Sequence, residues 1–366
     1  MSILPSRIVA ILSTCCVLAG GGAVYGQSQT PGTKKAEKVA ADGPGHRFGR
    51  VEPIARPKDT IRVCSYNVLN LFDPFDDPEL QGKYDDLAMA TPRERCEAIA
   101  KAIRAVDADV LCLQEIEGEE ALRWFRDEFL ADQGYDHLVS RDVGYYRGVE
   151  QSVLSRFPVT AVTVWPEEGL ADMEARKTGE GWTEDGEIPS RFQRSPLMVD
   201  VEVPATKDRE AYEFTVVVVH HKSGRHRRQR ESEALQLVDL LGQRLQAEPD
   251  ANIMVLGDFN ANPGDRSVKV YKDAGFVNAY DHRWMKSGDS RALFRTHESD
   301  RAIDYMMIHP NLDAEIVDGT FQVVGTMHPG DAYDWRKDEP PAGYAADHYP
   351  LVIDVRPVES GSPGSR

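Results

Sequence analysis

Three segments decide the fold: "IRVCSYNVL" (61–69), "TPRERCEAIAKAIRAVD" (91–107) and "ADVLCLQE" (108–115). The first and third are short and apolar, which predicts two buried strands. In the middle segment apolar residues recur at helical spacing, and Thr91, Pro92 and Glu94 at its start predict a capping box. A strand, a helix and a strand in this order predict parallel neighbouring strands joined by a right-handed crossover.

Six later segments also have the composition of strands, because they are short, β-branched and separated by turn-rich sequence. They are "SVLSRFPVTAVTV" (152–164), "SPLMVDVEV" (195–203), "EFTVVVVHH" (213–221), "NIMVLGDFN" (252–260), "AIDYMMIHP" (302–310) and "YPLVIDV" (349–355). Helices are expected at 119–130 and at about 227–246, over the outer faces of two sheets. We therefore predict an α/β fold, a four-layer α/β/β/α sandwich of two packed mixed sheets.

The composition is that of one folded domain with tails. The chain has 366 residues, of which 41% are hydrophobic, enough for one large core. We place the domain at 58–356, after a polar, Gly-, Pro- and Lys-rich segment (27–57) that predicts a flexible linker, and before a frayed tail (357–366). The formal net charge of −17 argues against a protein coated in nucleic acid. The basic run at 220–230 still permits a nuclease, although it also fits the solvated first turn of a helix.

The first 26 residues (1–26) are typical of a secretory signal peptide. They carry a lone Arg7, an apolar run and a small-residue end, a pattern too short for a stable membrane span. We expect a secreted or periplasmic monomer whose mature chain has no transmembrane segment. Cys15 and Cys16 leave lipid attachment as an alternative, but Thr14 is bulkier than the residue usual before a lipid-bearing cysteine.

The remaining cysteines are Cys64, Cys96 and Cys112. Their odd number and their spacing predict buried thiols rather than disulfides or a metal site. Cys64 and Cys112 each precede a polar strand-end residue by three positions, so we expect them side by side on the opposite face of the sheet.

Polar side chains recur at the ends of the predicted strands. Gly257 in "VLGDFNANPGD" (255–265), for example, lets the chain leave a buried strand and deliver acidic and amide groups into a loop. The set comprises Asn67, Glu115, His220, Asp258, Asn260, Asp304, Asp347 and His348. Each residue alone has an ordinary structural explanation as a turn former or a hydrogen-bonded loop residue. Their joint occurrence predicts a functional cleft.

The motifs that contain these residues resemble those of the endonuclease/exonuclease/phosphatase superfamily. They are "YNVLNL", "LQEIE", "VHHKS", "GDFNANP", "RAIDYMMI" and "ADHYPLVI", in the order typical of that superfamily and spanning residues 62–355. The resemblance implies a deoxyribonuclease I-like sandwich and metal-dependent hydrolysis of phosphoesters. It also implies that Glu115 is the principal metal ligand, with Asn67 beside it and Asp347 supporting the site. A hard divalent cation suits such oxygens; Mg²⁺ is expected, and Mn²⁺ and Ca²⁺ are alternatives.

The same resemblance implies roles for the other motif residues. Asp258 is expected to be the general base that takes a proton from the attacking water, while Asn260 orients the phosphate. His348 is expected to bond a phosphate oxygen, with Asp304 fixing its tautomer.

Substrate contacts are expected on either side of these groups. The pattern H-x-K-S assigns phosphate binding to His220 and a substrate contact to Lys222; His221 is the alternative, because strand alternation turns only one of the two histidines toward a cleft. Tyr146 and Arg147 in "GYYRG" are further candidates, the alternative being an exposed turn. Long polar loops at 165–190 and 325–344 are expected to form substrate-selecting rims.

The leading hypothesis is an exported phosphodiesterase, above all a nuclease acting on DNA or RNA. A sphingomyelinase-like lipid phosphodiesterase and a small-molecule phosphatase share its catalytic set, so the motifs do not separate them. A catalytically inactive secreted binding module is the alternative of another class. Such a module is expected to have lost Glu115, Asp258 or His348, and all three are present.

Overall fold

The structure is a computed structural model that describes residues 45–78, 80, 86–170, 189–330 and 332–359. The predicted signal peptide and most of the predicted tail lie outside these ranges, so the predicted domain boundaries stay predictions. Residues 45–57, predicted to be part of a flexible linker, lie against the domain in the structure. β1 (Gly45–His46) pairs with β13 (Met327–His328), and Arg56 forms an ion pair with Asp109.

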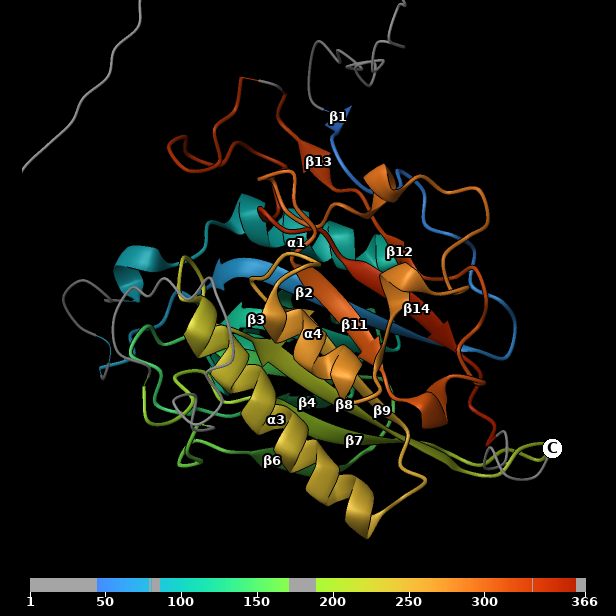
Figure 1. The fold of residues 1–366 in the computed structure, drawn as a ribbon. Coiled ribbons are helices and arrows are strands. Elements are labelled where there is room, and N and C mark those ends of the chain that lie inside the picture. Colours follow the sequence, from blue (N-terminus) through green and yellow to red (C-terminus); the bar gives the residue numbers. More distant parts are fainter. Residues whose placement is uncertain (1–44, 79, 81–85, 171–188, 331, 360–366) are drawn as a thin grey trace, which may run out of the picture. The chain divides into compact units, whose positions relative to one another are not determined.

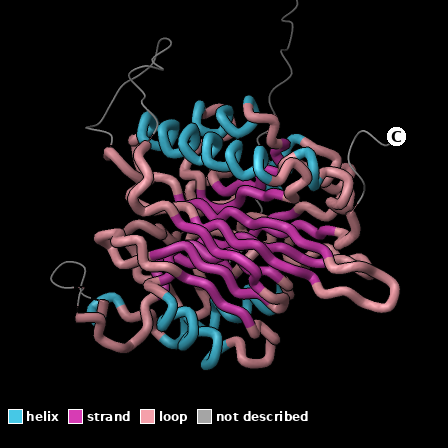
Figure 2. Tube along the Cα trace, turned by 90° about the horizontal axis from the view of Figure 1, so that it is seen from below, coloured by secondary structure: helices cyan, strands magenta, loops and turns pink. Residues whose placement is uncertain are grey.

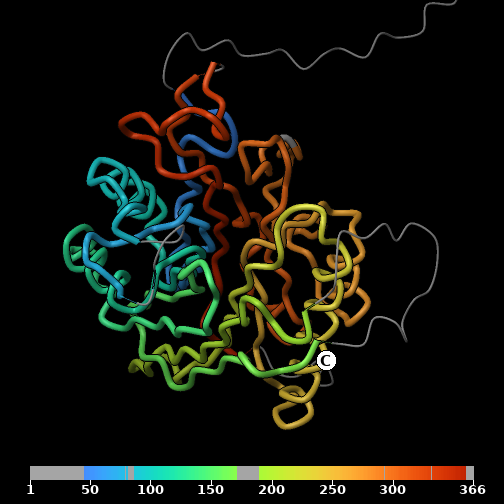
Figure 3. The backbone as a smooth tube through the Cα atoms, turned by 90° about the vertical axis from the view of Figure 1, so that its left-hand side faces the viewer, coloured from blue at the N-terminus to red at the C-terminus, as the bar shows by residue number. Residues whose placement is uncertain are grey.

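The first sheet holds the first and last long strands of the chain. Its strand order is β12 (Gln322–Val323), β14 (Leu351–Val355), β2 (Ile61–Leu71), β3 (Val110–Ile116), β5 (Glu150–Ser155) and β4 (His137–Ser140). β2 and β3 are parallel and are joined through α1 (Arg93–Val106), as predicted, whereas the other neighbours are antiparallel. Figure 3 shows the C-terminal segment beside the N-terminal strand, as the pairing of β14 with β2 requires.

The second sheet holds the middle of the chain. Its strand order is β10 (Val277–Asn278), β11 (Asp304–Ile308), β9 (Ile253–Asp258), β8 (Tyr212–His220), β7 (Leu197–Val203) and β6 (Val159–Val164). β8 and β9 are the parallel pair, and α3 (Arg227–Ala247) connects them. Both sheets are therefore mixed, as predicted (Figure 1).

Apolar side chains fill three layers between the elements. One cluster, which includes Val63 and Val218, lies between the two sheets. A second packs the first sheet against α1 and α2 (Glu119–Phe129), and a third packs the second sheet against α3 and α4 (Arg266–Asp273). Figure 2 shows the strands in the middle with helices above and below them. The four-layer sandwich is confirmed, and no described helix has the length and apolar character that a membrane span requires.

The predicted strand at 152–164 is two strands in two different sheets. β5 ends at Ser155 and β6 begins at Val159, and the chain crosses from the first sheet to the second between them. Pro158 lies in the crossing, where it has no N–H to offer to a ladder. β-branched residues on both sides of the break gave the whole segment the composition of a single strand.

The predicted capping box is wrong. α1 begins at Arg93 without a side-chain cap. The hydroxyl of Thr91 instead accepts the backbone N–H of Phe72 over 2.9 Å and contacts the carbonyl oxygen of Asn70 at 3.3 Å. The hydroxyl of Thr91 therefore bonds to the chain around Phe72, a contact that competes with capping of α1.

The three cysteines in the described domain are buried free thiols, as predicted. The expectation that Cys64 and Cys112 lie side by side on one face is wrong. The register pairs Cys64 with Leu111 and Ser65 with Cys112, so the two thiols face opposite sides of the sheet. Cys64 belongs to the core beneath α1, and Cys112 to the core between the sheets.

Candidate active site

Asp258, at the C-terminal end of β9, is the central residue of the site. Gly257 before it has a φ of +138°, and a Cβ there would lie 2.0 Å from the carbonyl oxygen of Val219 in β8. Glycine therefore allows β9 to lie this close to its parallel neighbour. The register then places His220 of β8 and Asp304 of β11 directly beside Asp258, one on each side.

The first sheet supplies the opposite wall through Glu115 and Asn67. Glu115 lies at an irregularity of β3 and has a φ of +67°, the kind of bulge that re-aims a side chain. Its Oε2 accepts the backbone N–H of Asn70 over 2.9 Å, and its Oε1 lies 3.6 Å from Nε2 of His220. The side-chain amide of Asn67 donates to Oδ2 of Asp258 over 3.3 Å. The ends of both sheets thus meet at one site.

The carboxylate of Asp258 is held by Asn260 from two sides. The backbone N–H of Asn260 donates to Oδ1 over 2.8 Å, and its side-chain amide donates to Oδ2 over 2.9 Å. Burial raises the pKa of Asp258 to about 7, against the opposing effect of His348. A carboxyl group that titrates near neutrality is suited to exchange a proton with water.

His348 lies over the same row of residues. Its Nδ1 is 2.9 Å from Oδ2 of Asp304, and its Nε2 is 3.7 Å from Oδ2 of Asp258. Burial disfavours the charged imidazolium, but Asp304 and Asp258 outweigh burial and raise the pKa of His348 well above its usual value. The geometry therefore presents a protonated Nε2 beside Asp258.

The two adjacent histidines at the end of β8 point in opposite directions. His220 faces Glu115 and Asp258, and its Nδ1 is buried without a partner. Burial, together with the charge of Arg194, lowers the pKa of His220 well below its usual value, so the ring is neutral. His221 packs away from the site, with its ring nitrogens 3.2 Å from Glu233 and 2.9 Å from the hydroxyl of Tyr271.

The sequence profile of the endonuclease/exonuclease/phosphatase family matches residues 64–321. The chain belongs to the endonuclease/exonuclease/phosphatase family. Members of this family are phosphoric ester hydrolases, so this protein is a metal-dependent phosphoesterase, as the motifs predicted. No curated protein sequence matches the chain.

Solved structures share the family's fold with this chain. The catalytic domain of human nocturnin, solved with a bound sulfate, is 18% identical, covers 84% of this chain and 96% of its own, and has a TM-score of 0.53. An endonuclease/exonuclease/phosphatase from Bacteroides vulgatus is 14% identical, covers 81% of this chain and 99% of its own, and has a TM-score of 0.51. At these identities the likeness establishes the fold.

The residues present fit the divalent cation on which the family depends. Two groups of metal-ligating side chains occur among the described residues: Asp258, Asp304 and His348, and His297, Asp347 and His348. Within each group the ligand atoms lie within 4.8 Å of one another. Oδ1 of Asp347 is buried without a hydrogen-bond partner and lies 4.0 Å from Nε2 of His348. Burying a carboxylate whose oxygen lacks a hydrogen bond is costly, and a hard divalent cation bound to that oxygen would offset the cost. Of the predicted ligands Asn67, Glu115 and Asp347, these groups contain Asp347 alone, so the predicted ligand set stays a prediction.

Arg95, which sequence analysis did not single out, ties two loops of the site together. Its guanidinium on α1 donates to the carbonyl oxygen of Ala345 over 3.0 Å, and also to the backbone carbonyls of Val68 and Leu69 after the site residue of β2. The loop that carries Asp347 is thereby attached to the end of β2. A lone arginine on a helix face gives no signal of this role in the sequence.

The predicted substrate-contact residues Tyr146, Arg147 and Lys222 all lie in the described part of the chain. Arg147 donates to the side-chain oxygen of Asn70 over 2.9 Å, Tyr146 is 51% exposed, and Lys222 is half-buried. Burial alone would raise the pKa of Tyr146, but a hydrogen bond with Tyr145 and the charge of Lys222 outweigh burial and lower it. Of the predicted rim loops, residues 171–188 lie outside the described residues.

Arg194 is a second residue that sequence analysis missed. It is 5% exposed, its guanidinium lies 5.1 Å from the ring centre of Tyr145, and both terminal nitrogens are buried without a partner. Its charge acts on the ring of His220. An arginine in a turn before a strand is common, so only the tertiary structure reveals that its terminal nitrogens are buried without a hydrogen-bond partner among the described residues.

Glu150, at the start of β5, makes the stability of this wall depend on pH. Burial raises the pKa of its carboxyl group from 4.5 to about 8. Because the folded-state pKa exceeds the unfolded one, the stabilisation is complete below about pH 4.5 and is lost as the pH rises to about 8. In Glu150→Gln we expect this loss of stability to disappear. The difference in the free energy of unfolding between the variant and wild type is then expected to change by up to about 1.4 kcal/mol per pH unit between pH 4.5 and 8.

Urea unfolding at pH 5, 6, 7 and 8 measures this effect. The exposed Glu128→Gln is the matched control, and its stability is expected to follow the wild type at every pH. Parallel pH profiles for Glu150→Gln and wild type would contradict the prediction.

Proposed function

We propose that this protein is an exported Mg²⁺-dependent phosphodiesterase that cleaves the backbone of DNA or RNA with water as the nucleophile. The observation that carries the proposal is the pair formed by Asp258 and His348. A carboxyl group that titrates near pH 7 lies 3.7 Å from a protonated ring nitrogen. Such a pair can take a proton from water and bind the phosphate at the same time.

Asn67, Glu115 and Asp347 would hold the divalent cation. When bound, the cation neutralises charge on the phosphate and stabilises the leaving oxygen. Proton transfer is assigned to other residues: Asp258 ends β9 of the second sheet, and His348 lies in the segment that leads into β14 of the first sheet.

Asp258 would take the proton from the attacking water. Asn260 donates to both carboxylate oxygens and Asn67 donates to one of them, so the carboxylate is fixed in one orientation. A fixed base needs no reorganisation when the water attacks.

His348 would donate its Nε2–H to a phosphate oxygen. On the other side of the ring, Nδ1 of His348 lies 2.9 Å from Oδ2 of Asp304, and this carboxylate favours the charged imidazolium. His220 lies on the other side of Asp258, and its imidazole is neutral. This ring would be a second contact for the phosphate.

The residues predicted to contact substrate favour a charged polymer. Lys222 and Arg147 can contact phosphates that flank the scissile one, and the exposed ring of Tyr146 can stack on a base. Arg194 adds a buried guanidinium with free donors beside His220. These groups support a nuclease over a lipid phosphodiesterase, whose membrane substrate calls for an apolar rim.

Four substrates test the proposed function. The full chain is incubated with plasmid DNA, RNA, sphingomyelin and bis-nitrophenyl phosphate, with Mg²⁺ or with EDTA. We expect Mg²⁺-dependent cleavage of DNA or RNA and a rate lower by about 100-fold or more in His348→Ala, since a donor to the phosphate is removed. His137→Ala, on edge strand β4, is the matched control and is expected to retain the wild-type rate.

Other outcomes contradict the nuclease. Cleavage of sphingomyelin without cleavage of nucleic acid would support the lipid phosphodiesterase. Silence on all four substrates would favour the small-molecule phosphatase, to be tested with monophosphate esters, or the inactive binding module.

Export is part of the proposal and rests on residues 1–26. Cell fractionation and N-terminal sequencing of the expressed chain test it. We expect a processed chain outside the cytoplasm, whereas an intact, cytoplasmic chain would contradict export. Sedimentation of the same material tests the expected monomer.

A further inference from the structure

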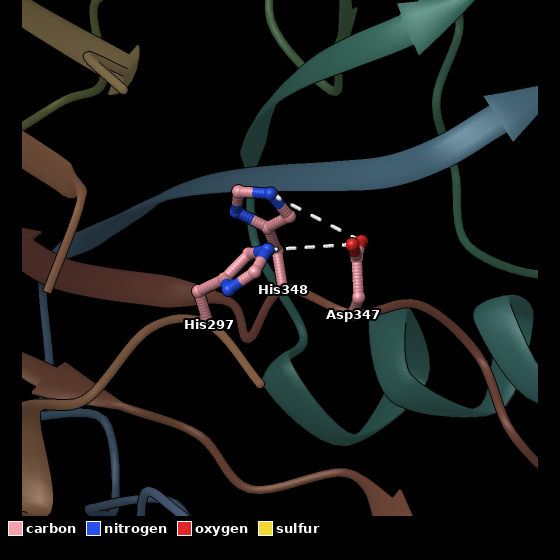
Figure 4. Close-up of side chains that lie close together, drawn as sticks. All are labelled: His297, Asp347 and His348. Atoms are coloured by element: carbon pink, nitrogen blue, oxygen red, sulfur yellow. Dashed lines mark ion pairs between the residues drawn. The ribbon is translucent and has the colours of Figure 1, made fainter. Parts of the chain in front are cut away.

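His297 lies beside the predicted site residues, although no sequence motif pointed to it. Its segment forms a backbone bridge with His348, and its ring lies edge-on to the rings of His348 and Trp335, with centroid distances of 4.5 and 4.7 Å. The side chain is 6% exposed. Packing on both sides thus holds the ring in one place. Figure 4 shows its Nε2 facing the carboxylate of Asp347.

The hydrogen bond at Nδ1 determines where the proton of this ring lies. The backbone N–H of Ser299 donates to Nδ1 of His297 over 2.9 Å, and the Ser299 hydroxyl, which accepts from Arg301, lies 2.7 Å from the same nitrogen. A neutral imidazole has one nitrogen that accepts and one that donates. Because Nδ1 accepts, Nε2 carries the proton, and Nε2 lies 3.3 Å from Oδ2 of Asp347.

The same bond argues against direct metal ligation by His297. The ring lies within ligand distance of a group formed with Asp347 and His348. A ligating Nε2 needs a lone pair, however, and the lone pair of the neutral ring is at Nδ1, where Ser299 uses it. His297 is therefore placed as a donor to the carboxylate rather than as a ligand.

We propose that His297 is a positioning residue, whose Nε2–H holds Oδ2 of Asp347 so that Oδ1 is presented to the divalent cation. Oδ1 is buried without a hydrogen-bond partner, and its ion-pair contact with Nε2 of His348 is long, at 4.0 Å (Figure 4). Groups that orient a ligand in this way sharpen metal affinity because they remove its alternative rotamers. The inference rests on the proposed function in one respect, the assignment of Asp347 as a metal ligand.

Calorimetric titration of the full chain with Mg²⁺ tests the inference without any measurement of activity. The variants are His297→Asn, whose amide reaches the position of Nδ1, and His297→Gln, whose amide reaches that of Nε2 and can still donate to Asp347. We expect His297→Asn to weaken Mg²⁺ binding by about 10- to 100-fold. His297→Gln is expected to restore binding close to that of wild type.

Two further variants complete the experiment. Ser299→Ala removes the hydroxyl contact with Nδ1 but keeps the backbone N–H that sets the tautomer, so it is expected to bind Mg²⁺ like the wild type. Asp347→Asn is expected to weaken binding at least as much as His297→Asn. Thermal unfolding of each variant in EDTA shows whether the fold is retained.

The outcomes separate the inference from the proposed function. Normal Mg²⁺ binding by Asp347→Asn would overturn the ligand role of Asp347, and the inference with it. Weak binding by Asp347→Asn with normal binding by His297→Asn would overturn the inference alone. Failure of His297→Gln to restore binding in a folded protein would also overturn it, because ligation or packing would then account for the loss.

Discussion

Asp258→Asn is expected to lower the rate of metal-dependent phosphodiester hydrolysis by about 1,000-fold, within the range of loss for a positioned general base. The asparagine amide has nearly the same shape, so it can occupy the site between His220 and Asp304, although its NH₂ group gives up at least one of the hydrogen bonds from Asn260. It cannot accept a proton from water. The substitution therefore removes one chemical step while the arrangement of the strands is kept.

Stability distinguishes this effect from misfolding. Asp258 lies among other buried acids, and Asp304 and Glu115 both oppose its ionisation. Removing one of these charges is expected to leave the metal-free protein as stable as wild type or more stable, a common result at active sites. Thermal unfolding in EDTA measures this property.

The matched control is Asp273→Asn, at the exposed end of α4, which is expected to retain full activity. Full metal-dependent activity in a folded Asp258→Asn protein would show that another group is the base.

Asp354→Ala is expected to destabilise the fold by about 3–5 kcal/mol, because it leaves the guanidinium of Arg62 buried without its counter-charge. The two residues face each other across β14 and β2. Nε of Arg62 donates to Oδ1 of Asp354 over 2.7 Å, and Nη2 donates to Oδ2 over 2.9 Å. Both residues are buried, with exposures of 4% and 0%.

A double variant separates the pair from the cavity that alanine creates. Arg62→Met with Asp354→Leu replaces two buried charges by apolar side chains of similar length, a change that is often neutral or stabilising. We expect it to recover most of the stability lost in Asp354→Ala. Urea unfolding at pH 7 measures both variants, and Asp354→Asn gives a milder variant should alanine prevent folding.

Equal stability of wild type and Asp354→Ala would contradict the prediction. The exposed pair of Lys269 and Asp273 is the control, since Asp273→Ala is expected to cost no more than about 1 kcal/mol.

Much of the fold could be predicted from the sequence, because buried strands and helix faces require apolar residues at a regular local spacing. β2, β3, β8 and β9 are apolar runs that end in polar residues, and the parallel pair β2 and β3 follows from the helix between them. Where a second partner competes, the local pattern misleads. Thr91 bonds to the chain around Phe72 instead of capping α1, and the run at 152–164 crosses between sheets at Pro158.

The candidate site divides in the same way. The motif residues could be named because the resemblance assigns them, and the structure brings Asn67, Glu115, Asp258, Asp304 and His348 to the ends of facing strands. Their chemical roles stay predictions. Arg194 and His297 could not be named, because each depends on contacts with segments distant in the chain.

The sequence by itself determined which residues are buried in strands, where those strands end in polar groups, and that the motifs belong to a metal-dependent phosphoesterase. Only the tertiary structure decided that His220 rather than His221 faces Asp258, and that His297 faces Asp347. The physical reason is that side-chain periodicity follows from the local backbone. Which face meets which partner depends on the register and packing of distant strands.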